Sequence, residues 1–291
     1  MKSIKKVVLG MSLFAFTVGF SQDDDNNQQS NIQKYTPSKL IGKGQWDIKW
    51  FNNLYTETRS TFEEGRIPRA TFFTSTIETF TGVDEDKKWN VGLILKVRSN
   101  VVKDSPALDV FKFGNDEDIS RSGLTSFAPS VKFVPFENIG NFSVQSALYI
   151  PLVKEETIND IFLDQKGFIW QNRFFYDYTF PSKKWQLFSE LNTEYNFGDK
   201  QDSFANNSLI LAPGVFLSYF PSYKFTILGL AQFSQRVDLG NNFGQNYFAM
   251  GGGAKYQLTN ALNLELLYTN FLAGTSTGLG QTFNLGLRMI L

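Results

Sequence analysis

The chain of 291 residues contains neither cysteine nor histidine. Without cysteine it can form no disulfide, and it has no attachment point for the lipid of a lipoprotein. Without histidine it cannot build a Ser-His or Asp-His catalytic pair, nor a Cys-His zinc site. We therefore expect no metal and no cofactor, and we predict that the protein is not an enzyme.

Paired carboxylates are the catalytic arrangement that remains. Glu190 and Glu194 share one face of a predicted strand, but four residues at about 3.3 Å each place their Cα atoms about 13 Å apart. This exceeds the carboxyl separation that glycosidases use, so the side chains would have to bend toward each other. The acidic run at 115–118 lacks the spacing of an EF-hand and is interpreted as a solvated loop.

The chain also lacks a basic stripe, which argues against nucleic acid as a partner. Lys2, Lys5 and Lys6 begin a segment whose residues 7–20 are mostly apolar, yet too short to cross about 30 Å of hydrocarbon. The triplet Gly19-Phe20-Ser21 fits a small-x-small cleavage site, so residues 1–21 are predicted to be a secretory signal peptide. Their removal lowers Lys+Arg from 28 to 25 against 28 Asp+Glu, leaving about three net negative charges.

Residues 22–44 are polar and begin with the acidic run 23–25. Such a composition cannot bury enough apolar surface to fold, so we predict a flexible periplasmic segment. A docking role for the acidic run is the alternative to a solvated tail.

A sustained helical period is missing from residues 45–291, and strand-like runs take its place. Each run has about 10 to 15 residues, the length of a tilted strand that crosses a membrane. The predicted strands are 45–58, 69–82, 89–102, 121–136, 142–153, 168–180, 185–197, 208–220, 224–237, 245–258, 262–273 and 281–291.

The connections between these runs alternate between tight turns and longer polar links. Outer-membrane barrels show this asymmetry, with short turns on the periplasmic side and longer loops outside. We therefore predict an all-β fold, a transmembrane antiparallel up-and-down β-barrel of about 12 strands at 45–291, located in the cell outer membrane. An even strand count places both chain ends in the periplasm.

The distribution of side chains distinguishes this barrel from a soluble sandwich. In the run 89–101 the odd positions are apolar and the even ones mostly polar, a pattern that fits both folds. Aromatic residues gather at strand ends, among them Trp46, Trp89 and Trp185 beside short turns and Trp170 at the other rim. Aromatic girdles are typical of the two membrane interfaces, so the pattern favours the membrane barrel.

If the apolar faces meet lipid, the opposite faces point into the lumen. Positive and negative side chains are nearly balanced there, and they either fill the barrel with salt bridges or line a passage. Twelve strands lie between the filled eight-stranded barrel and the water-filled 16-stranded porin, so both interpretations stay open. The predicted lumen-lining residues are Lys49, Lys96, Arg98, Arg173, Asp177, Glu190, Glu194, Arg236, Glu265 and Arg288.

Several aromatic residues share that inward parity: Phe51, Tyr55, Tyr149, Phe175, Phe188, Phe216 and Phe271. They are space-fillers in one interpretation and a path for an apolar or aromatic solute in the other. The loop 103–120, with Phe111 and Phe113 flanked by charge, is the candidate docking element or lumen plug.

The last strand alternates strictly and carries Asn284, Gly286, Met289 and Leu291 at the spacing polar-x-Gly-x-x-apolar-x-apolar. This resembles the C-terminal assembly signal of Gram-negative outer-membrane β-barrels, which more often end in Phe or Trp. The resemblance implies that the last strand closes the barrel against the first, and that the barrel assembly machinery is a partner during biogenesis.

The abundance of Asn, Phe and Tyr together with the signal peptide resembles Bacteroidetes-type barrels. The run Leu209-Ile210-Leu211-Ala212-Pro213-Gly214-Val215 is similar to the meta-pathway phenol-degradation group of outer-membrane transporters, from which no binding residue carries over. The resulting expectation is a narrow channel or transporter, with membrane lipid around it, for a small uncharged, zwitterionic, apolar or aromatic solute. A structural or accessory subunit that docks through its loops, with an unknown envelope partner, is the alternative.

Overall fold

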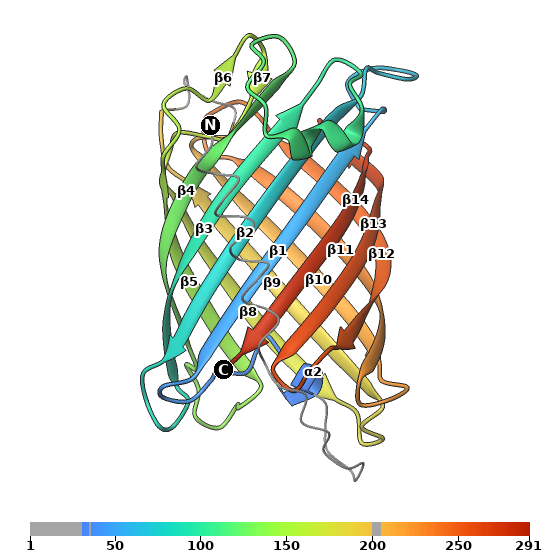
Figure 1. The fold of residues 1–291 in the computed structure, drawn as a ribbon. Helices are drawn as coiled ribbons and strands as arrows, with labels where there is room; N and C mark the ends of the chain where they lie inside the picture. The colour runs from blue at the N-terminus through green and yellow to red at the C-terminus, as the bar shows by residue number, and fades with distance from the viewer. Residues whose placement is uncertain (1–30, 35, 200–204) are drawn as a thin grey trace.

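Twelve long antiparallel strands form one closed β-barrel in the computed structural model, which describes residues 31–34, 36–199 and 205–291 (Figure 1). The predicted signal peptide and residues 22–30 lie outside this described part. The barrel strands are β1 (Trp46–Glu57), β2 (Ala70–Gly82), β3 (Trp89–Val101), β4 (Ser120–Phe133), β5 (Phe142–Pro151), β8 (Ile169–Thr179), β9 (Trp185–Asn196), β10 (Ser208–Tyr219), β11 (Phe225–Asp238), β12 (Gln245–Gln257), β13 (Leu262–Thr275) and β14 (Gln281–Ile290).

Each barrel strand pairs with the strands before and after it, and β14 pairs with β1 to close the sheet. The closing register runs from Asp47 opposite Ile290 to Thr56 opposite Gln281. The prediction of a closed antiparallel barrel with twelve strands is therefore confirmed. Closure satisfies every edge of the sheet, which is what lets a β-structure exist in a medium without water.

Side chains alternate between the two faces of the barrel because the strand period is two. In β3, Trp89, Val91 and Leu93 are exposed on the outer face, while Ile94 and Asn90 are buried inside. Ring pairs form at the strand ends near the short turns, with centroids of Trp89 and Phe133 separated by 5.0 Å. The outer surface is thus apolar in the middle and aromatic at this rim.

The two rims of the barrel differ, as the alternating connections predict (Figure 1). We call them the short-turn rim, where β14 ends, and the long-loop rim. The long-loop rim carries a hairpin of β6 (Thr157–Ile158) and β7 (Ile161–Phe162) and the 3₁₀ helix η2 (Ala107–Lys112), while α2 (Asn31–Lys34) lies at the short-turn rim. No helix within the described ranges has the length and apolar character needed to span a membrane.

Candidate functional site

The barrel encloses a cavity of about 1030 Å³. Its lining extends from Pro37 and Ala261 near the short-turn rim to Glu57 and Gly278 near the long-loop rim. The cavity therefore follows most of the barrel axis, and it is the candidate site for a solute.

Seven of the ten predicted lumen residues line this cavity, namely Lys49, Lys96, Arg98, Arg173, Glu190, Glu265 and Arg288. The other three point inward but do not line the cavity. Asp177 is buried beneath residues that precede β1, Glu194 accepts hydrogen bonds from Gln171 and Asn192, and Arg236 donates to Ser208 at 3.0 Å. Whether any of these side chains contacts a solute stays a prediction.

A chain of ion pairs runs along one wall and then crosses the lumen. Arg288 of β14 binds both carboxylate oxygens of Asp47, at 2.9 and 2.8 Å, and Lys49 lies 3.6 Å from Asp47 and 3.7 Å from Glu78 of β2. Arg173 of β8 then bonds Glu78 at 3.3 Å and Glu190 of β9 at 2.7 Å.

Three strands, β3, β4 and β5, separate β2 from β8 in the barrel wall. The pair between Arg173 and Glu78 therefore bridges non-adjacent strands through the interior and narrows it. We call it the lumen bridge. Glu78 is missing from the lumen residues predicted from the sequence, because strand 70–82 has Thr or Ser on both faces and so lacks a clean alternation of polar and apolar residues. The available signal was that Glu78 lies on the same face of the strand as Thr74 and Thr76.

Apolar side chains also reach the cavity from the wall formed by β10 to β13. Phe216, Leu228, Leu230 and Leu267 line the cavity there. A row of rings continues from this wall, with centroids of Phe216 and Phe188 at 5.5 Å and those of Phe188 and Phe175 at 6.0 Å. The lumen lining is thus mixed: apolar side chains and ion pairs, among them Lys255 of β12 with Glu265 of β13, both reach the cavity.

Residues 36–43, which we call the mouth segment, lie inside the barrel at the short-turn rim. Ile41 is 2% exposed and exchanges two hydrogen bonds with Asn90, whose amide donates to its carbonyl at 2.8 Å. The Lys132 ammonium donates to the Pro37 and Lys39 carbonyls, and Ser38 donates to Asp177.

This packing differs from the flexible behaviour predicted for 22–44. The mouth segment is ordered because lumen side chains satisfy its polar backbone and enclose its apolar side chains. Composition alone could not show this, since the partners come from strands far along the chain.

The connection between β5 and β8, residues 152–168, folds over the opposite end, and we call it the lumen loop. Asp164 forms an ion pair with Arg98 of β3 at 3.3 Å, and Asn100 donates to the Phe162 carbonyl at 2.7 Å. Gln165 donates to Asn196 of β9 at 3.0 Å. Strands on both sides of the barrel therefore hold this loop.

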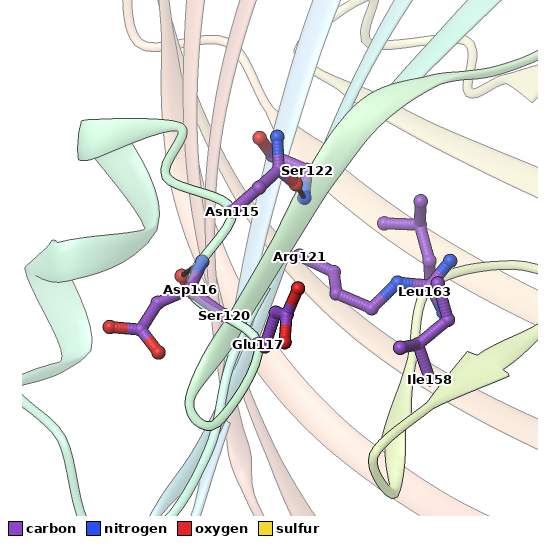
Figure 2. Close-up of a pocket in the computed structure, with 8 residues that line it drawn as sticks. All are labelled: Asn115, Asp116, Glu117, Ser120, Arg121, Ser122, Ile158 and Leu163. Atoms are coloured by element: carbon purple, nitrogen blue, oxygen red, sulfur yellow. Dashed lines mark hydrogen bonds between the residues drawn. The ribbon is translucent and has the colours of Figure 1, made fainter.

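Arg121 of β4 fixes the base of the lumen loop. Its guanidinium donates to the carbonyls of Glu155, Glu156 and Ile161 at 2.8 to 2.9 Å. Figure 2 shows this side chain pointing from the strand toward Ile158 and Leu163, beside a smaller cavity of about 270 Å³. Three bonds from one side chain hold the loop backbone in a single arrangement.

The connection between β3 and β4, residues 102–119, is different and is called the outer loop. Its η2 residue Val110 is fully buried against Phe73 and Val101, which point away from the lumen. The ring of Phe111 lies 5.0 Å from that of Phe73. The prediction of a lumen plug at 103–120 is therefore wrong, because the apolar residues of this loop pack on the apolar outer face and not on the polar inner one.

Electrostatics favour the closed position of the lumen loop. Burial alone would raise the pKa of Asp164, but the positive charges of Arg98 and Lys96 hold that pKa below its usual range. The carboxylate is therefore ionised at neutral pH, and the pair with Arg98 is intact.

The residues of the predicted assembly signal sit where β14 closes the barrel. Leu291 exchanges two backbone hydrogen bonds of 2.9 Å with Trp46, and its side chain is exposed. Asn284 accepts a bond from Asn53 at 2.6 Å, Gly286 lies between Phe51 and Glu265, and Met289 is paired with Ile48. Their role in assembly stays a prediction, which a lower outer-membrane level of Leu291→Asp would support.

The carboxylates weighed for catalysis are engaged elsewhere. Glu190 is paired with Arg173, and Glu194 accepts bonds from two amides. Among the described residues, no group of three acidic side chains could hold a metal ion.

Comparison with known proteins identifies the architecture. No protein-family model matches the sequence, and no curated protein matches it. An outer membrane channel from Pseudomonas putida F1 has a similar structure, with a TM-score of 0.66, 9% identity, and coverage of 88% of this chain and 99% of the channel. The β domain of the Bordetella autotransporter BrkA follows, with a TM-score of 0.54, 13% identity, and coverage of 84% and 98%. At these identities the likeness extends to the fold alone: the chain is a closed antiparallel β-barrel of twelve strands, similar in fold to an outer membrane channel.

Proposed function

We propose that this protein is an outer-membrane channel for a small solute. The observation that carries the proposal is the cavity along the axis of a closed barrel, lined by both charged and apolar side chains. A barrel that serves only as a scaffold could fill its interior with apolar side chains. Ions buried without water destabilise a fold by several kcal/mol each, so a scaffold would be expected to avoid them. The similar fold of an outer membrane channel agrees with the proposal.

The short-turn rim faces the periplasm in this proposal, and the long-loop rim faces outward. The mouth segment then narrows the periplasmic end and the lumen loop the outer end, with the lumen bridge between them. These three constrictions describe a narrow pathway for single small molecules and not an open porin.

The solute class follows from how the charges are arranged. Most lumen charges are already paired, as in Arg288 with Asp47 and Lys255 with Glu265, so the passage presents no strong net field to a free ion. The apolar wall with Phe216 and Leu230 can shelter hydrocarbon. An uncharged or zwitterionic molecule with an apolar part fits this lining best.

Uptake into liposomes tests the proposal. Folded protein in liposomes should admit small uncharged and zwitterionic solutes faster than it admits inorganic ions of similar size. Arg173→Met, which removes the lumen bridge, should raise uptake, whereas Lys87→Met in the turn between β2 and β3 should leave it unchanged. Uptake no greater than that of empty liposomes, for wild type and for Arg173→Met, would overturn the proposal.

One observation favours an accessory subunit as a second candidate. The outer loop leaves Leu108, Phe111 and Phe113 at least 46% exposed beyond the barrel wall. Lipid can cover such residues, and so can a neighbouring envelope protein. A stoichiometric partner that stays with the protein in mild detergent, and is lost in Phe111→Ser, would support this candidate.

A further inference from the structure

Four carboxylates line the lumen cavity: Glu57, Glu78, Glu190 and Glu265. Three of them form ion pairs, Glu78 and Glu190 with Arg173 and Glu265 with Lys255. Within the described part of the chain, Glu57 forms none, and its one hydrogen bond comes from the Tyr55 hydroxyl at 2.6 Å. The Glu57 carboxylate at the long-loop end of the lumen is therefore without a cationic partner among the described residues.

Aromatic rings surround the same end of the cavity. Tyr55 lies 5.1 Å from Phe271 and 6.1 Å from Phe72 between ring centroids. Tyr247 stacks on Phe271 at 4.3 Å. All four rings line the cavity together with Glu57, and they come from β1, β2, β12 and β13. We call Glu57 and these four rings the aromatic box.

The connection between β13 and β14 fixes the position of the Glu57 side chain. A Cβ atom added at Gly278 would overlap the Glu57 carboxylate and lie 2.5 Å from the Tyr55 hydroxyl. Only glycine lets this backbone approach so closely. The loop thus presses against the carboxylate and the tyrosine and holds both in place at the cavity wall.

This combination has a specific chemical complement. Ring faces attract a cation through their quadrupole, and a carboxylate without a partner adds a full opposite charge. An uncharged aromatic solute would use the rings but leave Glu57 unsatisfied, and a metal ion would find no group of three acidic side chains among the described residues. We propose that the aromatic box binds an organic ammonium group, that of a small amine or zwitterion, as the outer recognition site of the channel. This inference rests on the proposed function in taking the lumen as the path of the solute.

Choline and its uncharged isostere 3,3-dimethylbutan-1-ol are suitable probes, because they differ mainly in the positive charge. Calorimetry on the full folded chain in detergent should show saturable binding of choline and much weaker binding of the isostere. Glu57→Gln should weaken choline binding roughly tenfold or more, since it removes a charge-assisted contact. Tyr247→Leu, which keeps the carboxylate and removes a ring, should weaken it as well.

Glu63→Gln is the matched control, since it makes the same change of charge on an exposed residue of the same rim. It should bind choline like the wild type. Heat-modifiable migration in gels verifies that each variant is folded, and if Glu57→Gln fails to fold, Tyr247→Leu and Gly278→Ala decide the question. Equal binding of choline and isostere, or undiminished binding in the folded variants, would overturn the site.

The outcomes separate this inference from the proposed function. Uptake of uncharged solutes without choline binding would reject the aromatic box and leave the channel standing. Choline binding that depends on Glu57, without uptake of any solute, would keep the box and reject the channel.

Discussion

Asp164, in the loop after β7, lies 3.3 Å from Arg98 of β3, so a residue outside the barrel wall is held by one inside the lumen. The pair joins the lumen loop to the strand that also carries Asn100, which bonds the same loop. This charged contact is thus one of several that hold the lumen loop over that end of the barrel.

Asp164→Asn should release the lumen loop and increase the conductance of the channel. The amide cannot form the ion pair, and hydrogen bonds to charged groups contribute about 1.5 to 3 kcal/mol each. Single-channel recording in a planar bilayer measures the effect. Asp160→Asn, an exposed residue of the same loop, is the control. Identical conductance of Asp164→Asn and the wild type would show that the loop does not restrict passage.

The same pair predicts how the channel responds to acid. The pKa of Asp164 lies below its usual value of about 3.9, so the pair stabilises the closed loop at all higher pH values. That stabilisation is lost as the pH falls through the lowered pKa. Conductance should be constant from pH 8 to pH 5 and rise only below about pH 4, and Asp164→Asn should lack this rise. A rise between pH 7 and pH 5 would point to another group.

Breaking the lumen bridge should widen the middle of the passage. Arg173→Met keeps an unbranched side chain but leaves Glu190 without its cation and Glu78 with Lys49 alone, which should lower the free energy of unfolding by about 2 kcal/mol. We expect larger conductance steps and a lower midpoint of unfolding in urea. The triple variant Arg173→Met, Glu78→Gln and Glu190→Gln should recover stability and keep the larger conductance steps. Conductance steps of wild-type size in this triple variant would argue against the lumen bridge as a constriction.

The mouth segment should restrict the periplasmic end. Deleting residues 36–43 removes the contacts with Asn90, Lys132 and Asp177, and the barrel strands keep their own pairing. Conductance should therefore increase while heat-modifiable folding persists. Lys132→Met tests the same contact without a deletion. A deleted chain that folds and conducts like the wild type would exclude the segment as a restriction.

The barrel could be predicted from the sequence because its determinants are local. Alternation in β3, from Trp89 to Val101, needs only the strand period, and the closing of β14 on β1 follows from an even number of such strands. Predicted strand limits differ from the observed ones by up to three residues, as at the end of β4. The charged lumen positions follow from the same parity.

What the sequence could not show depends on contacts between distant residues. The mouth segment has the composition of a polar tail, and only the structure shows that Asn90 and Lys132 donate hydrogen bonds to its backbone carbonyls. The sequence left the loop 103–120 as either a docking element or a lumen plug, and it could not show that Phe73 and Val101 provide its apolar contacts on the outer face. The lumen bridge depends on the diameter of the barrel, since Arg173 must reach Glu78 across it.

Conductance of the purified barrel in a planar bilayer tests the channel most directly. The wild type should give small, uniform steps, and the variants Arg173→Met and Asp164→Asn should give larger ones. Deletion of the outer loop, residues 103–119, should leave the steps unchanged because this loop packs outside the lumen. Absence of steps from the wild type and from both variants, in preparations with heat-modifiable folding, would contradict the channel and favour the accessory subunit.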